Sequence, residues 1–265
     1  MRLSPSTVLA GAVAAALICA SAGHADDARG AALLDTLVEA YPDHLAGHDG
    51  ANLLWKDGTR MPFDDGRRDK SFDQLLDEAD IEDQFHWPYP RGQTAGPPGF
   101  NVDPGRARNT AFFTKMYGDC RKGEVARNLV EIVWLPGHGA ARIKATRVNG
   151  VAERLKDVSA ALDALPKELI KYLKPTAGIY NCRAIAGTNR PSVHGFGAAI
   201  DINVKFANYW RWTKPGADGR YPYRNQVPRA VIEIFEAHGF IWGGKWYHYD
   251  TMHFEYRPEL LRAAR

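Results

Sequence analysis

A proline-rich stretch divides this chain into two parts with different patterns, and it limits the folds open to the sequence. Five prolines fall between residues 86 and 107: Pro88, Pro90, Pro97, Pro98 and Pro104. Proline lacks the backbone N–H that helices and inner strands need, so neither element runs easily through this stretch. The sequence therefore predicts a long loop or linker here and a domain boundary near residue 107.

Before this stretch the pattern is partly helical. Apolar residues recur at helical spacing over residues 31–40, and Ser71, a favoured N-cap, begins a second predicted helix over residues 71–78. Residues 47–69 are rich in glycine and charged side chains and show no clear period. We expect a mainly helical and irregular N-terminal extension over residues 26–107, whose role the sequence does not define.

The first residues have the features of a secretion signal. Arg2 is followed by an apolar run over residues 8–18, and small residues then lead to Ala25. This order is typical of a signal peptide, here over residues 1–25. An uncleaved anchor is the alternative, but the run is short for a membrane span. We expect an exported protein, periplasmic or extracellular, with no stable membrane span after cleavage.

The composition is that of a globular protein. Hydrophobic residues make up 45% of the chain and charged residues 25%, which are ordinary values. The formal net charge is +3, and the sequence has no dense run of lysine and arginine. A surplus this small does not indicate a nucleic-acid partner. The oligomeric state cannot be read from the sequence.

Strands and helices are mixed in the part after residue 107. The hydrophobic pattern predicts strands over residues 129–135, 141–148, 178–185, 198–204 and 251–256, and helices over residues 151–165 and 229–238. The turn residues 136–139 join the first two strands. We expect an α+β domain over residues 108–265, with a small antiparallel sheet and flanking helices.

Two cysteines remain if the signal peptide, which contains Cys19, is removed. In an exported chain Cys120 and Cys182 are expected to form one disulfide. The alternative is a pair of buried free thiols. Neither cysteine has the paired spacing of a zinc ligand.

The clearest chemical signal is the segment from Ser192 to Asp201. His194 stands in a glycine-bearing turn, and Asp201 follows within an apolar run. An ionised carboxylate among apolar neighbours is costly unless it is paired or binds a cation. A metal, a buried ion pair or an outward-facing side chain would each account for Asp201.

A second histidine near the C-terminus favours the metal. His253 lies in a strand-like segment, and two imidazoles with one carboxylate form a ligand set that zinc accepts, with a fourth position open to water. Asp250 precedes His253 by three residues and therefore has to lie at the edge of the strand to reach the same site. There it can act as a general base. Glu255 shares a face with His253 and can hydrogen-bond to it.

The two segments together resemble the M15 metallopeptidases of bacteria and phages. The pattern Ser-x-His-x-x-Gly-x-Ala-x-Asp is present as Ser192, His194, Gly197, Ala199 and Asp201, and Asp-x-x-His-Phe-Glu is present at residues 250–255. The resemblance covers roughly residues 108–260. It leaves residues 26–107 unexplained.

The resemblance implies a single zinc ion held by His194, Asp201 and His253, with Asp250 in the place of the general base. Many relatives carry glutamate there, so the shorter side chain of Asp250 has to approach from a different backbone position. Relatives also use an upstream arginine to hold a substrate carbonyl or carboxylate. Arg183 is our candidate for this role and Arg190 its rival, while Ser192 is expected to contact the substrate or to orient His194.

The resemblance therefore predicts a zinc peptidase acting on the peptide part of the bacterial cell wall, peptidoglycan. Two activities stay open: a D,D-carboxypeptidase and an L-alanyl-D-glutamate endopeptidase. A non-catalytic, zinc-containing wall-binding module is the alternative from another class. Other residues near the motifs are less informative. His248 is expected to be a solvated loop residue, with a substrate contact as the alternative. Trp242, Trp246 and Tyr247 either line the cleft or pack in the core.

Overall fold

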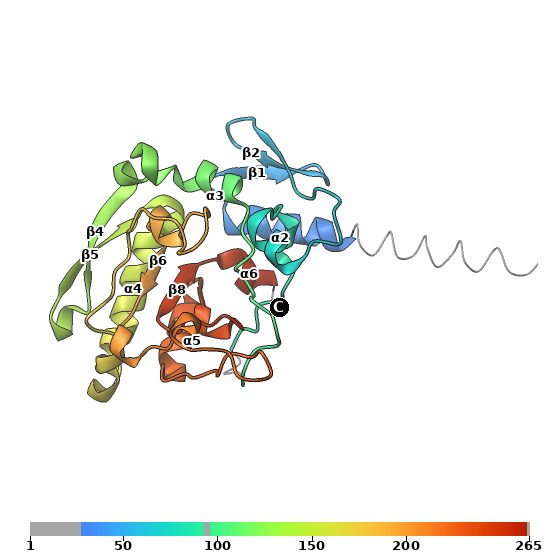
Figure 1. The fold of residues 1–265 in the computed structure, drawn as a ribbon. Coiled ribbons are helices and arrows are strands. Elements are labelled where there is room, and N and C mark those ends of the chain that lie inside the picture. Colours follow the sequence, from blue (N-terminus) through green and yellow to red (C-terminus); the bar gives the residue numbers. More distant parts are fainter. Residues whose placement is uncertain (1–27, 93–95, 264–265) are drawn as a thin grey trace, which may run out of the picture.

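The computed structural model describes residues 28–92 and 96–263. The predicted signal peptide, residues 1–25, lies outside the described residues. The described chain is α+β, as the sequence predicts, with small antiparallel sheets and several helices (Figure 1). No helix within residues 28–92 and 96–263 has both the length and the apolar character needed to cross a membrane.

Within the described residues, the strands form three separate sheets, each antiparallel. The first sheet has the order β1-β2-β3 and lies before the proline-rich stretch, the second is the hairpin β4-β5, and the third has the order β6-β8-β7. Their bounds are β1 Leu45–His48, β2 Asn52–Trp55, β3 Arg60–Pro62, β4 Leu129–Trp134, β5 Ala141–Thr146, β6 Ala199–Asp201, β7 Phe240–Trp242 and β8 His253–Tyr256.

A first helix covers residues 28–40. The other α-helices are α2 Phe72–Asp77, α3 Thr110–Tyr117, α4 Val151–Asp163, α5 Arg229–Ala237 and α6 Pro258–Ala263. The predicted helices over residues 31–40, 71–78, 151–165 and 229–238 are confirmed. Ser71 is the N-cap of α2, and the Ser71 and Gln74 side chains form a capping box with each other's backbone N–H groups.

The predicted strand over residues 178–185 is wrong. This segment makes only isolated bridges, from Gly178 to Asp201 and from Ala184 to Pro191. Gly178 has φ +125°, a conformation that interrupts a regular strand. The backbone N–H of Asn181 donates to the carbonyl of His194 instead of joining a sheet.

Several short elements have no counterpart in the predictions. β1, β2 and β3 have at most four residues each, too few to produce a visible alternation in a glycine-rich segment. The expected strand over residues 198–204 shortens to β6. α3, β7 and α6 also lie outside the predicted elements, and α6 begins at Pro258, a residue suited to the first turn of a helix.

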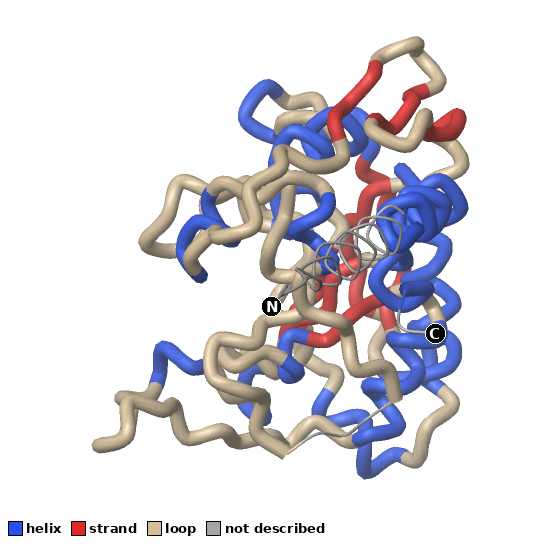
Figure 2. Tube along the Cα trace, turned by 90° about the vertical axis from the view of Figure 1, so that its right-hand side faces the viewer, coloured by secondary structure: helices blue, strands red, loops and turns tan. Residues whose placement is uncertain are grey.

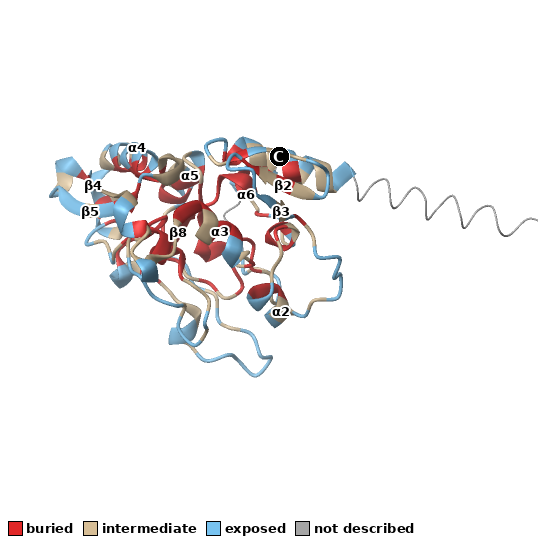
Figure 3. Ribbon diagram, turned by 90° about the horizontal axis from the view of Figure 1, so that it is seen from above, coloured by how far each residue is buried: buried red, intermediate tan, exposed pale blue. Residues whose placement is uncertain are grey.

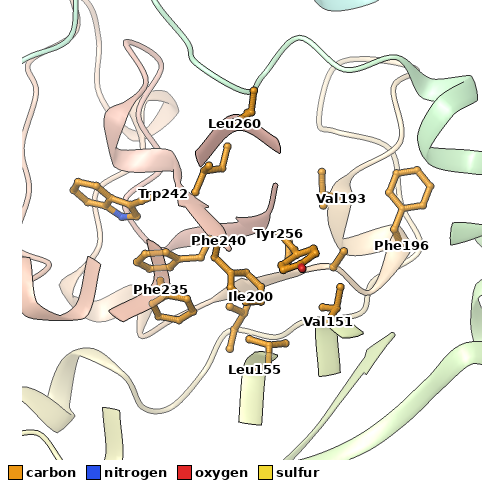
Figure 4. Close-up of a cluster of buried hydrophobic side chains, with 14 of the residues drawn as sticks. Val151, Leu155, Val193, Phe196, Ile200, Phe235, Phe240, Trp242, Tyr256 and Leu260 are labelled. Atoms are coloured by element: carbon orange, nitrogen blue, oxygen red, sulfur yellow. The ribbon is translucent and has the colours of Figure 1, made fainter. Parts of the chain in front are cut away.

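The sheet β6-β8-β7 lies at the centre of the molecule. α5 packs against β7, and α4 packs against β4, β5 and α5. Figure 4 shows the apolar side chains that meet there, among them Leu155 of α4, Ile200 of β6 and Phe235 of α5. Buried residues gather around β8 and α3, whereas the outer loops are exposed (Figure 3). This packing fixes the strands that carry the candidate site.

The segment before residue 107 packs into the same core. Tyr89 is buried, and its hydroxyl donates to Glu236 of α5 (2.7 Å) and accepts from the backbone N–H of Trp242 (2.9 Å). Lys245 completes this group by an ion pair with Glu236. Figure 2 shows that long loops make up one side of the molecule. The division into an extension over residues 26–107 and a domain over residues 108–265 stays a prediction.

Candidate metal centre and cleft

His194 lies on a short 3₁₀ helix, Val193–Phe196, that precedes β6. Gly197 ends this helix with φ +68°, and a Cβ atom at this position would lie 2.9 Å from Leu129 and 3.1 Å from the backbone nitrogen of Thr146. Both the conformation and the space require glycine. The glycine of the motif therefore turns the chain from His194 into the strand that carries Asp201.

Asp201 and His253 lie opposite each other on two adjacent strands. They are paired directly in the antiparallel ladder of β6 and β8, so their side chains project from the same face of the sheet. Asp201 Oδ1 lies 3.0 Å from His253 Nδ1 and 3.2 Å from His194 Nε2. The two imidazole nitrogens are 3.2 Å apart. Three donor atoms, two from residues 194–201 and one from residue 253, therefore lie close together.

Each histidine is oriented by a hydrogen bond from its other ring nitrogen. His194 Nδ1 donates to the carbonyl of Ile179 (2.7 Å), and His253 Nε2 donates to Glu255 Oε2 (3.0 Å). These bonds leave His194 Nε2 and His253 Nδ1 for a metal ion. Glu255 was expected to play this part, because residues two apart on a strand share a face.

Glu255 is itself held by two arginines. Its carboxylate pairs with Arg108 (3.1 Å) and Arg257 (3.2 Å), and Arg257 continues to Glu259 (2.5 Å). The Tyr41 hydroxyl, next to the helix over residues 28–40, donates to Glu259 (2.5 Å). The side chains of Glu255, Arg257 and Glu259 have no exposed area, so every charge in this chain of contacts has to be paired.

The charged groups at the candidate metal centre shift one another's pKa values. Burial alone would raise the pKa of Asp201, but hydrogen bonds from His194 and His253 hold it well below its usual range. Burial would also lower the pKa of His253, yet the bonds to Asp201 and Glu255 raise it to about 10. The carboxylates of Asp201 and Glu255 thus favour a positive charge at the candidate metal centre.

The geometry and the chemistry of the donors fit a zinc ion. Ligands about 2.0–2.2 Å from a tetrahedral zinc lie roughly 3.3 Å from one another, close to the donor separations of 3.0 to 3.2 Å in this structure. Among the described residues, His194, Asp201 and His253 form a group able to hold a metal ion. Two imidazoles and one carboxylate leave a fourth position open.

Asp250 lies next to this centre, before the start of β8. Its backbone N–H donates to Gly243 (3.0 Å), and its carbonyl accepts from the His253 N–H (3.2 Å). Asp250 Oδ1 is buried and has no hydrogen-bond partner within the described residues. Burial, and secondarily the charge of Asp201, raises the pKa of this carboxyl to about 7. A carboxyl with this pKa is suited to accept and return a proton.

A cleft of about 480 Å³ opens onto the centre. His194, Asp201, Asp250 and His253 line it, together with Ser192 and Arg183. The sequence-predicted site residues are therefore brought together. Ser192 is buried, whereas Arg183 is exposed and makes a hydrogen bond only to the carbonyl of Ala184 (3.3 Å) among the described residues.

Arg190, the rival of Arg183, faces elsewhere. Its Nε atom pairs with Asp77 of α2 (3.0 Å), and it donates to the carbonyl of Leu76. Trp246 lines the cleft, but Trp242 belongs to the buried core. The geometry therefore favours Arg183 over Arg190 as a residue that reaches a bound substrate.

A disulfide joins Cys120 and Cys182, as the sequence predicts, with their Cα atoms 5.6 Å apart. Cys182 directly precedes Arg183, and Asn181 is hydrogen-bonded to the backbone of His194. The crosslink therefore ties the loop that carries Arg183 to the end of α3.

The expectation that His248 is a solvated loop residue is wrong. Its Nδ1 lies 2.7 Å from Asp103 Oδ2, and its side chain is only 12% exposed. Sequence reasoning missed Asp103, Arg106 and Arg108, at the end of the proline-rich stretch. Arg106 and Arg108 line the cleft, Arg108 pairs with Glu255, and Asp103 pairs with Arg106 and His248. The available signal was three charged residues within six positions in a segment otherwise rich in proline and glycine.

Comparison with known proteins agrees with the motif reading. Residues 186–256 match a family model described as D-alanyl-D-alanine carboxypeptidase, one of the M15 peptidase families. The matched segment contains the three candidate ligands and Asp250, but not Asp103, Arg106 or Arg108. No curated protein and no solved structure matches the chain.

Proposed function

Since residues 186–256 match the model of an M15 peptidase family, we propose that the protein is an exported, zinc-dependent enzyme that hydrolyses peptide bonds in the stem peptides of peptidoglycan. The observation that carries the proposal is the meeting of His194, Asp201 and His253 at 3.0 to 3.2 Å on the wall of an open cleft. Export is proposed from the signal-like residues 1–25, and the location is then periplasmic or extracellular.

Metal binding and proton transfer are assigned to different residues. A zinc ion bound by His194, Asp201 and His253 would supply Lewis-acid activation of a water molecule and of the substrate carbonyl. Asp250 accepts a proton from the attacking water and passes it to the leaving amine. Its pKa of about 7 and the unpartnered Oδ1 atom support this role.

Substrate contacts are proposed for Arg183 and Ser192. An arginine guanidinium stabilises the oxyanion that forms at the attacked carbonyl, and it can do so through two parallel hydrogen bonds. Arg183 lines the cleft and has no acidic partner among the described residues, so its donors are available. Ser192 lies buried beside His194, where its hydroxyl can meet the substrate or the histidine.

The alternative of a non-catalytic wall-binding module has less support. Such a module needs no proton-transfer group, yet Asp250 is present at the centre with a raised pKa and a free oxygen. A buried carboxylate without a partner is costly, and a catalytic role accounts for that cost.

The test is the mass analysis of products from purified muropeptides, with the zinc-loaded protein and with the chelator-treated protein. Release of single D-alanine residues supports a carboxypeptidase, and cleavage between L-alanine and D-glutamate supports an endopeptidase. Both activities should stop after chelation and return with zinc. Intact muropeptides after incubation with zinc-loaded protein would refute the proposed function.

A further inference from the structure

Asp103 is a buried carboxylate that holds two residues of the cleft in place. Its Oδ1 accepts from the backbone N–H of His248 (2.9 Å), and its Oδ2 accepts from His248 Nδ1 (2.7 Å) and Arg106 Nη1 (2.7 Å). The Asp103 side chain has no exposed area. A carboxylate placed so deeply needs these partners, and it fixes the direction in which both of them point.

The remaining donors of these partners face the cleft. Arg106 and His248 both line it, and their side chains are 14% and 12% exposed. Within the part of the chain that the structure describes, Arg106 donates only to Asp103, and His248 Nε2 has no hydrogen-bond partner. A guanidinium has five N–H donors, so most of those on Arg106 remain for a ligand.

Two tryptophans support this arrangement from the sides. The Arg106 guanidinium lies over the ring of Trp246, at 5.7 Å from its centroid. The ring of His248 meets Trp210 edge to face, at 4.7 Å between centroids. Contact with an aromatic face leaves the N–H edges of a guanidinium free. Protein contacts therefore hold Arg106 and His248 in place, and their remaining N–H groups face the cleft.

The other two arginines of the cleft are arranged differently. Arg108 pairs through its Nη1 atom with Glu255, the acid that orients the candidate ligand His253, and Arg183 is exposed. Arg106 differs from Arg108 in its neighbour, because the buried acid that holds Arg106 also holds His248 at the wall of the cleft. Asp103 is shared between Arg106 and His248, so it does not occupy all the donors of either side chain.

We propose that Asp103 positions Arg106, with His248 beside it, as the subsite that binds the C-terminal carboxylate of the peptide substrate. This rests on the proposed function, because the ligand is the end of the peptide that the enzyme cleaves. His248 stands two residues before Asp250, which protonates the leaving amine. The carboxylate of a released terminal amino acid is one carbon from that amine, so it lies on the same side of the cleft.

The subsite predicts a carboxypeptidase, and it gives the end of the proline-rich stretch a part in substrate binding. A guanidinium binds a carboxylate through two parallel N–H···O bonds. An uncharged amide end cannot form this contact. Peptides with a free C-terminus should therefore bind better than otherwise identical peptides that end in a carboxamide.

The experiment compares one N-acetylated peptide ending in D-alanyl-D-alanine with its C-terminal carboxamide, on zinc-loaded wild type, Arg106→Gln, Asp103→Asn and Arg183→Gln. Wild type should show a KM for the free acid about 10- to 100-fold below that for the amide. Arg106→Gln should abolish this ratio and Asp103→Asn should reduce it, in each case because KM rises more for the free acid than for the amide. Arg183→Gln should keep the ratio.

A binding measurement separates this subsite from the proposed function. Quenching of tryptophan fluorescence is titrated with N-acetyl-D-alanine and with its amide, which requires no hydrolysis. If neither peptide is cleaved, the proposed function fails, while the preference for the acid still tests the subsite. Arg106→Lys, which keeps the charge but loses the paired geometry, should give an intermediate ratio. An unchanged ratio in Arg106→Gln, or a ratio lost in Arg183→Gln instead, would overturn the proposal.

Discussion

Two groups of close acidic or metal-binding side chains lie on either side of the proline-rich loop. After the loop, His194, Asp201 and His253 bring three donor atoms within 3.2 Å of one another. Before it, Asp65, Asp80 and Asp83 surround the ammonium group of Lys70 at 2.8, 3.1 and 2.5 Å. We call this second group the Lys70 cluster. Both groups include carboxylates, but only the Lys70 cluster contains its own cation.

The difference shows that close donor atoms do not by themselves define a metal site. The ligand atoms of Asp64, Asp65 and Asp80, and those of Asp80, Glu82 and Asp83, also come within 4.8 Å of one another. The Lys70 side chain, 1% exposed, already pairs with two members of each of these groups. Burial would lower the pKa of Lys70, but its bonds to Asp65, Asp83 and Asp80 raise it. Among the described residues, no lysine or arginine contacts the donor atoms of the first group, so these atoms stay open to a metal ion.

The largest effect is expected from removing a ligand of the first group. His253→Ala deletes one of three donors, and a catalytic zinc site does not hold its metal well with two. Zinc content should fall to background and turnover on muropeptides by about a thousandfold or more, as measured by elemental analysis and product mass. His138→Ala, a histidine far from the centre on the β4-β5 turn, is the matched control. A His253→Ala protein with full zinc content would contradict the ligand assignment.

The next effect separates metal binding from catalysis within the first group. Asp250→Asn keeps the shape of the side chain but removes its ability to accept a proton. Zinc content should match wild type, while kcat falls by about 10²- to 10⁴-fold. Elemental analysis and initial rates at saturating substrate measure the two quantities. Undiminished turnover would remove Asp250 from the mechanism.

Removing the built-in cation tests the second group. Lys70→Met leaves three carboxylates around an apolar side chain, and breaking a buried ion pair in this way costs about 3–5 kcal/mol of unfolding free energy. Zinc content should not change. Urea unfolding measures the loss, and Lys156→Met, an exposed lysine on α4, should change stability by about 0.5 kcal/mol or less.

Lys70→Met also tests whether the lysine is what keeps a metal ion out of the Lys70 cluster. Without its lysine, the Lys70 cluster consists of oxygen ligands that need a cation, which is the preference of calcium. Millimolar calcium should raise the melting temperature of Lys70→Met and leave that of wild type unchanged. Equal responses of the two proteins would show that the lysine is not what excludes a metal.

The sequence predicts the first group far better than the second. His194, Asp201 and His253 were found because their spacing matches a known motif, and Ser71 was found because a capping residue acts locally. The Lys70 cluster has no comparable pattern. Its carboxylates come from an irregular segment, and what makes them a group is a lysine that folding brings to their centre.

The cleft residues that the sequence analysis missed are also brought together only by folding. Asp103 binds His248, which is 145 positions away in the chain, and Arg106 shares the same carboxylate. Their segment was predicted to be a linker because proline marks loops, and that reading holds for the backbone. Proline content carries no information about what the side chains of a loop contact, so the extent of the cleft could not be predicted from local patterns.

The smallest effect concerns the contacts behind the first group. Glu255→Gln keeps an acceptor for His253 Nε2 but removes the charge that pairs with Arg108 and Arg257. A weaker partner orients His253 less well, so zinc affinity should fall by about 10- to 100-fold, as measured by competition with a chromophoric chelator.

Two control variants test whether the effect of Glu255→Gln on zinc affinity is specific. Glu131→Gln, an exposed acid paired with Arg142 on the β4-β5 hairpin, should leave zinc affinity unchanged. Asp83→Asn should weaken the Lys70 cluster and lower the unfolding free energy, again without changing zinc affinity. If Asp83→Asn lowered zinc affinity as much as Glu255→Gln, general loss of stability would explain both results. An effect confined to Glu255→Gln would show that a buried carboxylate can serve a metal it does not touch, by holding the histidine that does.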